Sequence, residues 1–368
     1  MRVLIAGGGT GGHYFPALAL GQELSERGHS VLFVGSERGI EGRLGFPPAQ
    51  TTLLLPSSSF RGKGLKSLLS IPGYLSSLTK TLSFVKTYKP ELSIIFGGYS
   101  SLPVGLASVL LKLPLFVQEQ NSVPGKTNRY LSRFAANAFL GFSSAASYLS
   151  CSSTFTGNPL RKEITETAFK AETSPETRKF YRKRLNLHPE RKTLLIIGGS
   201  QGALWLNQLL ERAIPHLPKE IQVIHLTGPG KEGRLKELYR AHRIPAFVAP
   251  FYERPWELYA TADAAVSRSG ALAMSELAAF KIPTLFVPYP FAADEHQLKN
   301  ALYLASRGGA FVHTQEELTL ELFLQRVKTL LFDIITTGKM KKVMGELFPL
   351  NARQKIADEL EEWKGRKS

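Results

Sequence analysis

The sequence contains little cysteine and no long apolar run. Its 368 residues include one cysteine, Cys151, which excludes an internal disulfide and fits a reducing compartment. The longest apolar candidate, 102–117, is interrupted by Lys112 and Pro114 and is too short for a membrane span of about 20 residues. Because the chain enters an apolar run almost at its first residue, we expect no signal peptide and a protein that is soluble or peripheral at a membrane.

Acidic residues are almost absent between Gly42 and Lys162, where the sequence has only Glu91 and Glu119. The formal net charge is +16, and the same span carries many bases: Arg43, Arg61, Lys63, Lys66, Lys80, Lys86, Lys89, Lys112, Lys126, Arg129, Arg133 and Arg161. The positive electrostatic field of such a segment attracts nucleic acid, anionic lipid or phosphorylated substrates. No zinc-finger, helix-turn-helix or RNP-type motif accompanies these bases, and apolar residues lie among them, so we favour an anionic membrane surface and expect no nucleic acid.

Several catalytic signatures are missing as well. The sequence has no D-x-D, no Cys/His cluster with zinc spacing and no Walker A motif. Neither of its two main glycine turns reads as G-x-G-x-x-G followed by an acid about twenty residues on, which disfavours NAD or FAD. We therefore expect no bound metal and no cofactor.

What the sequence does have is a strand–glycine turn–helix unit that occurs twice. The first is Gly7-Gly8-Gly9-Thr10-Gly11-Gly12-His13 after the apolar run 3–6, and the second is Gly198-Gly199-Ser200-Gln201-Gly202-Ala203 after 194–197. A helix that opens at such a turn directs unpaired amides at an anion, most often a phosphate. Two such units predict an α/β protein of two doubly wound, Rossmann-like domains. We place them at 1–160, joined by a C-terminal helix at about 350–368, and at 161–349.

The remaining apolar runs predict the other strands. We expect strands at 31–34, 53–55, 92–96, 115–117, 138–142 and 154–156 in the first domain, and at 222–226, 246–249, 264–267 and 284–287 in the second. The polar residues 118–121 are expected to leave the fifth strand and face a ligand crevice, beside a further glycine turn at 97–99. The charged stretch 163–192 is interpreted as the domain boundary, with a helical pattern at 181–187 only. The basic, apolar stretch 60–89 is either a membrane-contacting segment or a core helix with a solvated basic face.

These motifs together resemble the MurG family of bacterial peptidoglycan N-acetylglucosaminyltransferases. The motifs that carry the resemblance occur in order over nearly the whole chain: Gly8-Gly9-Thr10-Gly11-Gly12-His13, Arg61-Gly62-Lys63-Gly64, Gly97-Gly98-Tyr99, Glu119-Gln120-Asn121, Gly157-Asn158-Pro159-Leu160-Arg161, Gly198-Gly199-Ser200-Gln201-Gly202-Ala203, Arg268-Ser269-Gly270-Ala271 with Ser275-Glu276, and Gln297 with Asn300-Ala301. The resemblance implies a GT-B glycosyltransferase fold with two domains facing across a cleft. It also implies UDP-N-acetylglucosamine as donor, lipid I as acceptor, lipid II as product, and inversion at the anomeric carbon. The protein would act peripherally on the cytoplasmic side of the bacterial inner membrane, with cell-wall synthesis and division proteins as further partners.

The resemblance also implies the site residues. Donor-binding positions would be Thr10, Gly11, Gly12, Asn121, Arg161, Ser200, Tyr252, Ala271, Leu272, Ala273, Met274, Ser275, Glu276 and Gln297. Among them, Ser200 and Ser275 would face the diphosphate, Glu276 the ribose hydroxyls, Gln297 the sugar, and the backbone of Tyr252 the uracil. Arg61, Lys63, Gly98 and Tyr99 would serve the acceptor or the membrane, and the amides of 7–12 the acceptor's pyrophosphate.

The acceptor hydroxyl must lose a proton as it attacks. His13 is the first candidate for the general base and Glu119 the second. Two positions depart from the family pattern, since Gln118 stands where a histidine is frequent and Ser100-Ser101-Leu102 replaces Val-Ser-Gly. Two other classes remain open: a GT-B transferase with a soluble acceptor, and a non-catalytic protein that binds polyanions or lipid.

Overall fold

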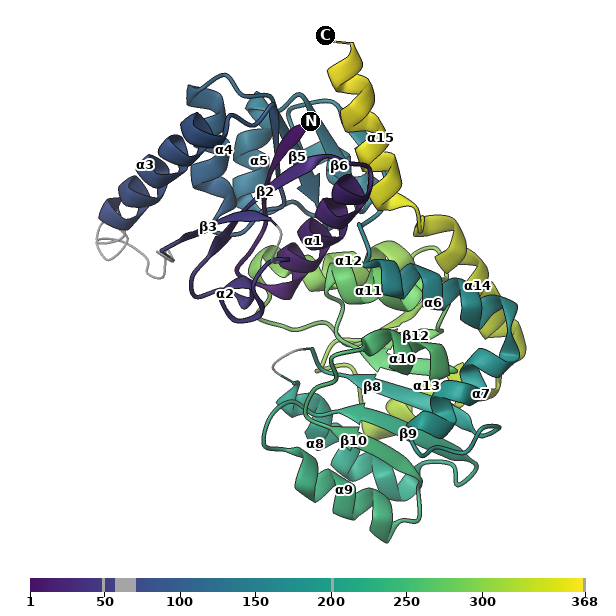
Figure 1. Ribbon diagram of the computed structural model, residues 1–368. Helices are drawn as coiled ribbons and strands as arrows, with labels where there is room; N and C mark the ends of the chain where they lie inside the picture. Colours follow the sequence, from purple (N-terminus) through teal and green to yellow (C-terminus); the bar gives the residue numbers. More distant parts are fainter. Residues whose placement is uncertain (48–49, 57–70, 200–201, 367–368) are drawn as a thin grey trace. The chain divides into compact units, whose positions relative to one another are not determined.

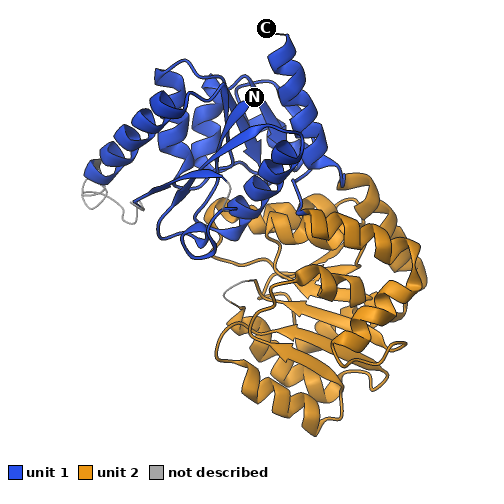
Figure 2. Ribbon diagram, in the orientation of Figure 1, with its two compact units in different colours: residues 1–161, 349–368 blue, residues 162–348 orange. Residues whose placement is uncertain are grey.

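The computed structural model describes residues 1–47, 50–56, 71–199 and 202–366. The chain forms two compact units (Figure 2). Unit 1 comprises Met1–Arg161 and Pro349–Ser368, and unit 2 comprises Lys162–Phe348. The division therefore falls one residue from the expected one, and the C-terminal segment belongs to unit 1.

Unit 1 is built on a parallel sheet with the order β3-β2-β1-β4-β5-β6-β7. Its strands are β1 Arg2–Ala6, β2 Ser30–Ser36, β3 Thr51–Leu55, β4 Leu92–Ile95, β5 Leu115–Glu119, β6 Asn137–Leu140 and β7 Ser153–Phe155. Its helices are α1 Gly11–Glu26, α2 Ile40–Leu44, α3 Ile71–Tyr88, α4 Ser101–Leu110, α5 Lys126–Leu131 and α15 Ala352–Gly365, with 3₁₀ turns η2 Ser132–Phe134 and η3 Ser143–Tyr148 (Figure 1).

Alternate residues of each strand in unit 1 are buried on opposite faces of the sheet. Val3 and Ile5 pack with α1 and with Ile356 and Leu360 of α15, whereas Leu4 packs on the other face with residues of α3, α4 and α5. The last helix is thus a structural part of unit 1. Trp363 completes this face, with its ring edge-on to Phe116 at 5.4 Å between centroids.

Ion pairs also hold α15 against unit 1. Arg27 contacts Glu23 at 2.9 Å, Asp358 at 2.6 Å and Glu361 at 3.0 Å, and His29 Nε2 lies 2.6 Å from a Glu361 oxygen. The bond from His29 is the largest cause that lowers the pKa of Glu361, followed by the opposing effect of burial and the bond from Arg27. The acidic side chains of α15 therefore pair with the basic side chains that follow the end of α1.

Unit 2 has a second parallel sheet with the order β10-β9-β8-β11-β12-β13. Its strands are β8 Lys192–Ile197, β9 Ile221–Leu226, β10 Ala246–Ala249, β11 Ala264–Ser267, β12 Thr284–Phe286 and β13 Phe311–Val312. Its helices are α6 Lys162–Thr173, α7 Pro175–Arg184, α8 Leu204–Ala213, α9 Glu232–Ala241, α10 Pro255–Thr261, α11 Ala271–Ala279, α12 His296–Ala305, α13 Leu320–Phe332 and α14 Ile334–Leu347, with 3₁₀ turns η4 Ile214–His216 and η5 Ala293–Glu295.

Three expectations about the fold are wrong. The stretch 163–192 contains two helices, α6 and α7, rather than one short helical pattern. The fifth strand continues through Gln118 and Glu119, which are buried, so these two side chains do not leave the sheet as a loop. The short strand β13 follows no long apolar run and was not expected. Among the described residues, no helix has the length and apolar character that crossing a membrane requires.

Candidate active site

Both sheets reverse their strand order beside the strand that precedes a glycine turn. In unit 1 the reversal lies between β1 and β4, and in unit 2 between β8 and β11. Open α/β sheets bind ligands beyond the carboxyl ends of the strands at such a switch point. The predicted site residues fall largely on the loops at these two places, which we describe one unit at a time.

In unit 1 the two turns at the switch point touch through their backbones. Gly98 has φ of +80°, and a Cβ built there would lie 2.4 Å from the Gly8 carbonyl oxygen. Gly9 has φ of +92° and lies beside the ring of Tyr99, which is 45% exposed. Glycine is therefore required at positions 9 and 98 by backbone conformation and at 98 also by space.

A carboxylate that the sequence did not reveal lies beneath the first turn. Glu41 of α2 is fully buried, and its two oxygens each lie 2.9 Å from the Gly9 amide, which donates to them. The Ser36 amide donates to the same carboxylate at 2.6 Å. A side chain at Gly8 would meet it, since a Cβ there would lie 2.0 Å from Glu41 Oε1. The buried Glu41 carboxylate therefore holds the backbone of this glycine turn in place through hydrogen bonds.

This contact corrects the expectation that all the amides of 7–12 receive a pyrophosphate. The Gly9 amide is bonded inward to Glu41, and Gly7 packs against Ala17 and Phe96. The amides of Gly11 and Gly12 instead open α1, at a helix start with no acid in its first turn and no side-chain cap from Thr10. An anion at this turn would therefore be bound by the helix N-terminus.

His13 lies at the centre of the unit 1 switch point. Its Nδ1 is 3.2 Å from Thr10 Oγ1, and the ring is partly exposed. Side chains built at Gly97 and Gly98 would come within 3.2 Å of Nε2 and 3.4 Å of Nδ1, so the ring packs against both glycines. The structure thus brings His13 to the turns after β1 and β4.

Glu119 has a different setting from the one expected. It is 1% exposed and accepts hydrogen bonds from the Asn121 amide (2.8 Å), Asn121 Nδ2 (3.1 Å), the Gly125 amide (3.2 Å) and Asn128 Nδ2 (2.8 Å). Burial raises its pKa, and the four hydrogen bonds oppose that rise. The carboxylate is thereby saturated by donors of its own loop, and it orders residues 121–128.

Asn128 of this loop lies close to the histidine, whereas Gln118 contacts other amide side chains. Asn128 Nδ2 lies 3.4 Å from the position of a Cβ on Gly97, the glycine that contacts His13. Gln118 is buried and donates to Asn158 Oδ1 at 3.2 Å. The position at which the family often has histidine is therefore part of an internal amide network in this chain.

Arg161, at the end of unit 1, lies on the same side of α1. Its guanidinium carbon is 4.4 Å from the centroid of Phe15, a cation–π distance. A Cβ on Gly11 would be 3.2 Å from the same phenyl ring. Arg161, Gly11 and His13 are thus grouped around the first turn of α1.

In unit 2, α11 begins at the switch point. Gly270 precedes it in an extended conformation, and the first turn is Ala271, Leu272 and Ala273, followed by the fully buried Met274. This turn contains no acid. The backbone amides at its start therefore form a second potential anion site.

The serine hydroxyls around α11 are directed inward. Ser275 is 2% exposed and donates to the Ala271 carbonyl at 2.9 Å, and Ser269 donates to the Gln297 carbonyl at 2.8 Å. The Ser275 hydroxyl bonds back along its own helix, so the role expected for the stretch 269–275 toward a diphosphate remains a prediction that depends on the backbone amides at the start of α11.

The other predicted residues of unit 2 lie on the loops and helices at this end of the sheet. Glu276 is 6% exposed and accepts a hydrogen bond from the Tyr259 hydroxyl at 2.8 Å, so it is not a solvated surface acid. Gln297 Oε1 accepts from the Tyr289 amide at 3.0 Å. The Tyr252 hydroxyl donates to Glu257 at 2.6 Å, which directs its side chain toward α10.

Arg268 is a further residue whose role the sequence did not reveal. It donates to the carbonyls of Val287 and Pro288 at 2.9 Å each and to Gln315 Oε1 at 2.7 Å. Burial lowers its pKa. Through these hydrogen bonds Arg268 links the loop after β11 with the loop after β12. The link holds the start of α11 in place.

Arg61, Lys63 and Ser200 lie outside the described residues. Among the residues that are described, no group of three or more His, Cys, Asp or Glu side chains is arranged to hold a metal ion.

Comparisons with known proteins define the class. The glycosyltransferase family 28 N-terminal domain matches residues 3–140, and the family 28 C-terminal domain matches residues 193–360. The calicheamicin glycosyltransferase CalG4 has a similar structure, with a TM-score of 0.72 over 100% of this chain and 99% of that one, at 14% identity. The fold is thus the GT-B fold, two Rossmann-like domains in one chain.

More similar proteins narrow the class to one family. The crystal structure of Acinetobacter baumannii MurG matches with a TM-score of 0.78 and 29% identity over 98% of this chain and 99% of that one. Relatives named UDP-N-acetylglucosamine–N-acetylmuramyl-(pentapeptide) pyrophosphoryl-undecaprenol N-acetylglucosamine transferase include one from Pseudomonas savastanoi (42% identical, 85% of each chain) and one from Geobacter metallireducens (33% identical, 98% of each). The chain belongs to this MurG family of glycosyltransferases.

Proposed function

We propose that this protein transfers N-acetylglucosamine from UDP-N-acetylglucosamine to the C4 hydroxyl of the N-acetylmuramyl unit of lipid I, giving lipid II. The names of its relatives support this substrate pair, since the chain matches them over most of their length. The observation that carries the proposal is the position of His13, a titratable ring held at the switch point between two glycine turns.

In the proposed reaction the C4 oxygen of the acceptor attacks the anomeric carbon of the donor. The bond from that carbon to the diphosphate oxygen breaks, the configuration inverts, and UDP leaves with the electron pair. His13 takes the hydroxyl proton, because imidazole is the side chain best suited to accept a proton near neutral pH. Glu119, the second candidate, acts as a positioning residue, since its oxygens already accept four hydrogen bonds.

Unit 2 holds the donor in this proposal. The amides of Ala271, Leu272 and Ala273 at the start of α11 would stabilise the diphosphate as charge develops on it, and one such donor is worth about 3 kcal/mol in a transition state. Met274 and Ser275 would support this turn from within α11. Glu276 would bind the ribose, Gln297 the sugar, and the Tyr252 backbone the uracil, with Ser200 at the other turn.

Unit 1 holds the acceptor in this proposal. Thr10, Gly11, Gly12, Asn121 and Arg161 are the positions of unit 1 that the family resemblance assigns to the donor, and of these Thr10, Gly11 and Arg161 lie around the first turn of α1. Since the amides at the start of α11 would stabilise the diphosphate, we propose neither a metal nor an organic cofactor.

The membrane-facing surface is also assigned to unit 1. Helix α3 has exposed bases, Lys80 and Lys86, and Leu75 is 58% exposed. Basic side chains near an anionic leaflet each contribute about 1 kcal/mol to binding. This face, together with Gly98 and Tyr99, would meet lipid I at the cytoplasmic side of the inner membrane, where cell-wall synthesis and division proteins are further proposed partners. Arg61 and Lys63 remain candidates for the same role from the sequence alone.

The test incubates the protein with labelled UDP-N-acetylglucosamine and a lipid I analogue in anionic vesicles, and measures transfer of the labelled sugar. A parallel reaction contains an acceptor that lacks the lipid. Transfer to the lipid analogue with a β-linked product, retained after EDTA treatment, is expected. Transfer to the soluble acceptor alone would indicate a different GT-B transferase. Vesicle co-sedimentation without any transfer would indicate a lipid-binding protein.

A further inference from the structure

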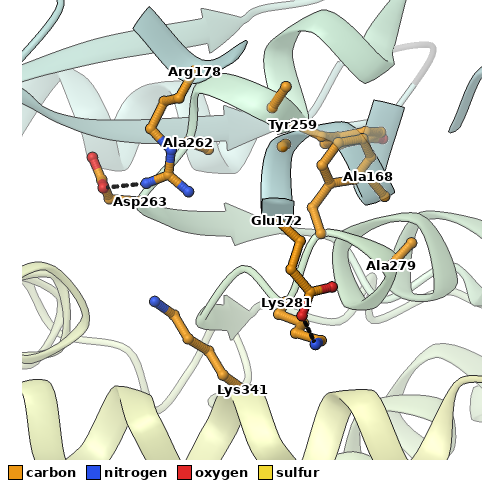
Figure 3. A pocket seen from close by; sticks show the side chains of 12 residues that line it. Ala168, Glu172, Arg178, Tyr259, Ala262, Asp263, Ala279, Lys281 and Lys341 are labelled. Atoms are coloured by element: carbon orange, nitrogen blue, oxygen red, sulfur yellow. Dashed lines mark hydrogen bonds and ion pairs between the residues drawn. The ribbon is translucent and has the colours of Figure 1, made fainter. Parts of the chain in front are cut away.

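Unit 2 contains a cavity of about 260 Å³ that the proposed reaction does not use (Figure 3). It is formed by α6, α7, α10, α11 and α14, together with the residues that follow α10 and α11. Part of its wall is apolar and consists of small or aromatic side chains: Ala168, Ala171, Ala279 and Phe280. At about 30 Å³ for each water molecule, the space equals roughly nine waters.

Three cationic side chains also line this cavity. Arg178 donates through Nη1 to Asp263 at 2.8 Å, and Lys281 pairs with Glu172. Lys341 extends from α14 toward the cavity (Figure 3), and within the described part of the chain it has no hydrogen-bond or ion-pair partner. Arg178 has five N–H donors, of which the described residues engage the one that reaches Asp263.

The local charge balance is positive. Asp263 is also paired with Arg182 at 2.6 Å and lies 3.8 Å from Lys192, so three cations already surround this carboxylate before Lys341 is counted. Partial burial and then repulsion by Arg178 lower the pKa of Lys341. An anion beside Lys341 and Arg178 would relieve that repulsion.

We propose that this cavity binds a small organic phosphate, with its phosphate on Lys341 and the remaining donors of Arg178, and its apolar part against Ala171 and Phe280. A dianion fits the excess of positive charge, and a planar guanidinium together with an ammonium is a common phosphate-binding pair. The volume limits the ligand to roughly ten non-hydrogen atoms. The apolar wall distinguishes such a ligand from inorganic phosphate.

One residue, Tyr259, connects the cavity with the candidate donor site. Tyr259 lines the cavity, and its hydroxyl donates to Glu276, the residue proposed for the ribose. The cavity lining contains none of the residues proposed to contact the donor, so the binding test does not depend on the proposed transferase activity.

The test measures phenyl phosphate binding to the full-length protein by titration calorimetry at about pH 8, where the phosphate is a dianion. Lys341→Met should weaken binding about tenfold or more, since it removes a charged donor. Lys342→Met is the matched control, because it removes the same charge from the neighbouring position of α14 outside the cavity lining. Ala171→Leu should block phenyl phosphate by filling the cavity.

Wild-type binding that is lost in Lys341→Met and Ala171→Leu and kept in Lys342→Met would support the proposal. Absence of binding to the wild type, or equal binding by wild type and Lys341→Met, would overturn it. If inorganic phosphate binds as tightly as phenyl phosphate, the apolar wall does not contribute to binding, and the proposal of an organic ligand is wrong.

Discussion

The buried carboxylate under the glycine turn offers a sharp test of how the site is built. Replacing Glu41 by glutamine keeps the size of the side chain and removes its charge. The Oε1 oxygen accepts from the Gly9 and Ser36 amides, and Oε2 also accepts from the Gly9 amide. In glutamine an NH2 group, which only donates, replaces one of these two acceptor oxygens. We expect Glu41→Gln to lose at least one charge-assisted hydrogen bond and to leave a buried donor unsatisfied.

The expected cost is about 2–3 kcal/mol, the range for hydrogen bonds to charged groups. For a unit of this size that corresponds to a fall in Tm of about 4–12 °C in the transition of unit 1. Because Gly9 lies against Tyr99 and the turn contacts His13 through Gly98, transfer activity should fall as well.

Calorimetry and the transfer assay together measure this effect. Glu37→Gln is the matched control, since it removes the same charge from an exposed position in the turn between β2 and α2. A Glu41→Gln protein with wild-type stability and wild-type transfer would refute the idea that this carboxylate holds the turn.

Three further predictions concern the remainder of unit 1. Glu119→Gln should lower kcat/KM without shifting the pH profile, because in this proposal Glu119 orders a loop and His13 is the base; a shifted profile would indicate that Glu119 is the base. Ile356→Ala, at a fully buried position of α15, should destabilise unit 1 by about 2–5 kcal/mol in chemical denaturation, and a loss below 1 kcal/mol would show that α15 is not part of the core. The pKa of Glu361 is lowered in the folded state, so its stabilising contribution is complete above its unfolded pKa of about 4.5 and is lost as the pH falls below that value. Glu361→Gln should therefore flatten the pH dependence of the stability of unit 1 below this pH. An unchanged dependence of stability on acid pH would contradict a contribution of the Glu361–His29 pair.

The sequence predicts those parts of the fold that local patterns determine. Apolar runs that end at glycine turns identify the strands β1, β8 and β11 and the helices α1, α8 and α11 that follow them. It fails where tertiary burial overrides local polarity. Glu119 ends a strand although it is an acid, since four donors of one loop converge on it, and no local pattern encodes that loop.

The same limit applies to the candidate site. The position of His13 follows from its place at the end of the first glycine turn. Glu41 could not be found in this way, because it is an isolated acid on a five-residue helix, and its contact with Gly9 spans 32 positions of the chain. Helix α6 was missed, and α7 was predicted only over its last residues, because the surfaces of both helices are rich in charge and few of their residues are buried.

The most direct test of the central claim compares the wild type with His13→Ala in the transfer of labelled N-acetylglucosamine to a lipid I analogue, with UDP-N-acetylglucosamine binding measured on both proteins. Loss of a general base lowers a rate by about 100-fold or more. The account predicts that transfer falls by this amount or more while donor binding is retained. Wild-type transfer by His13→Ala would contradict the assignment of the base, and absence of transfer by a wild-type protein that binds the donor would contradict the assignment of the acceptor.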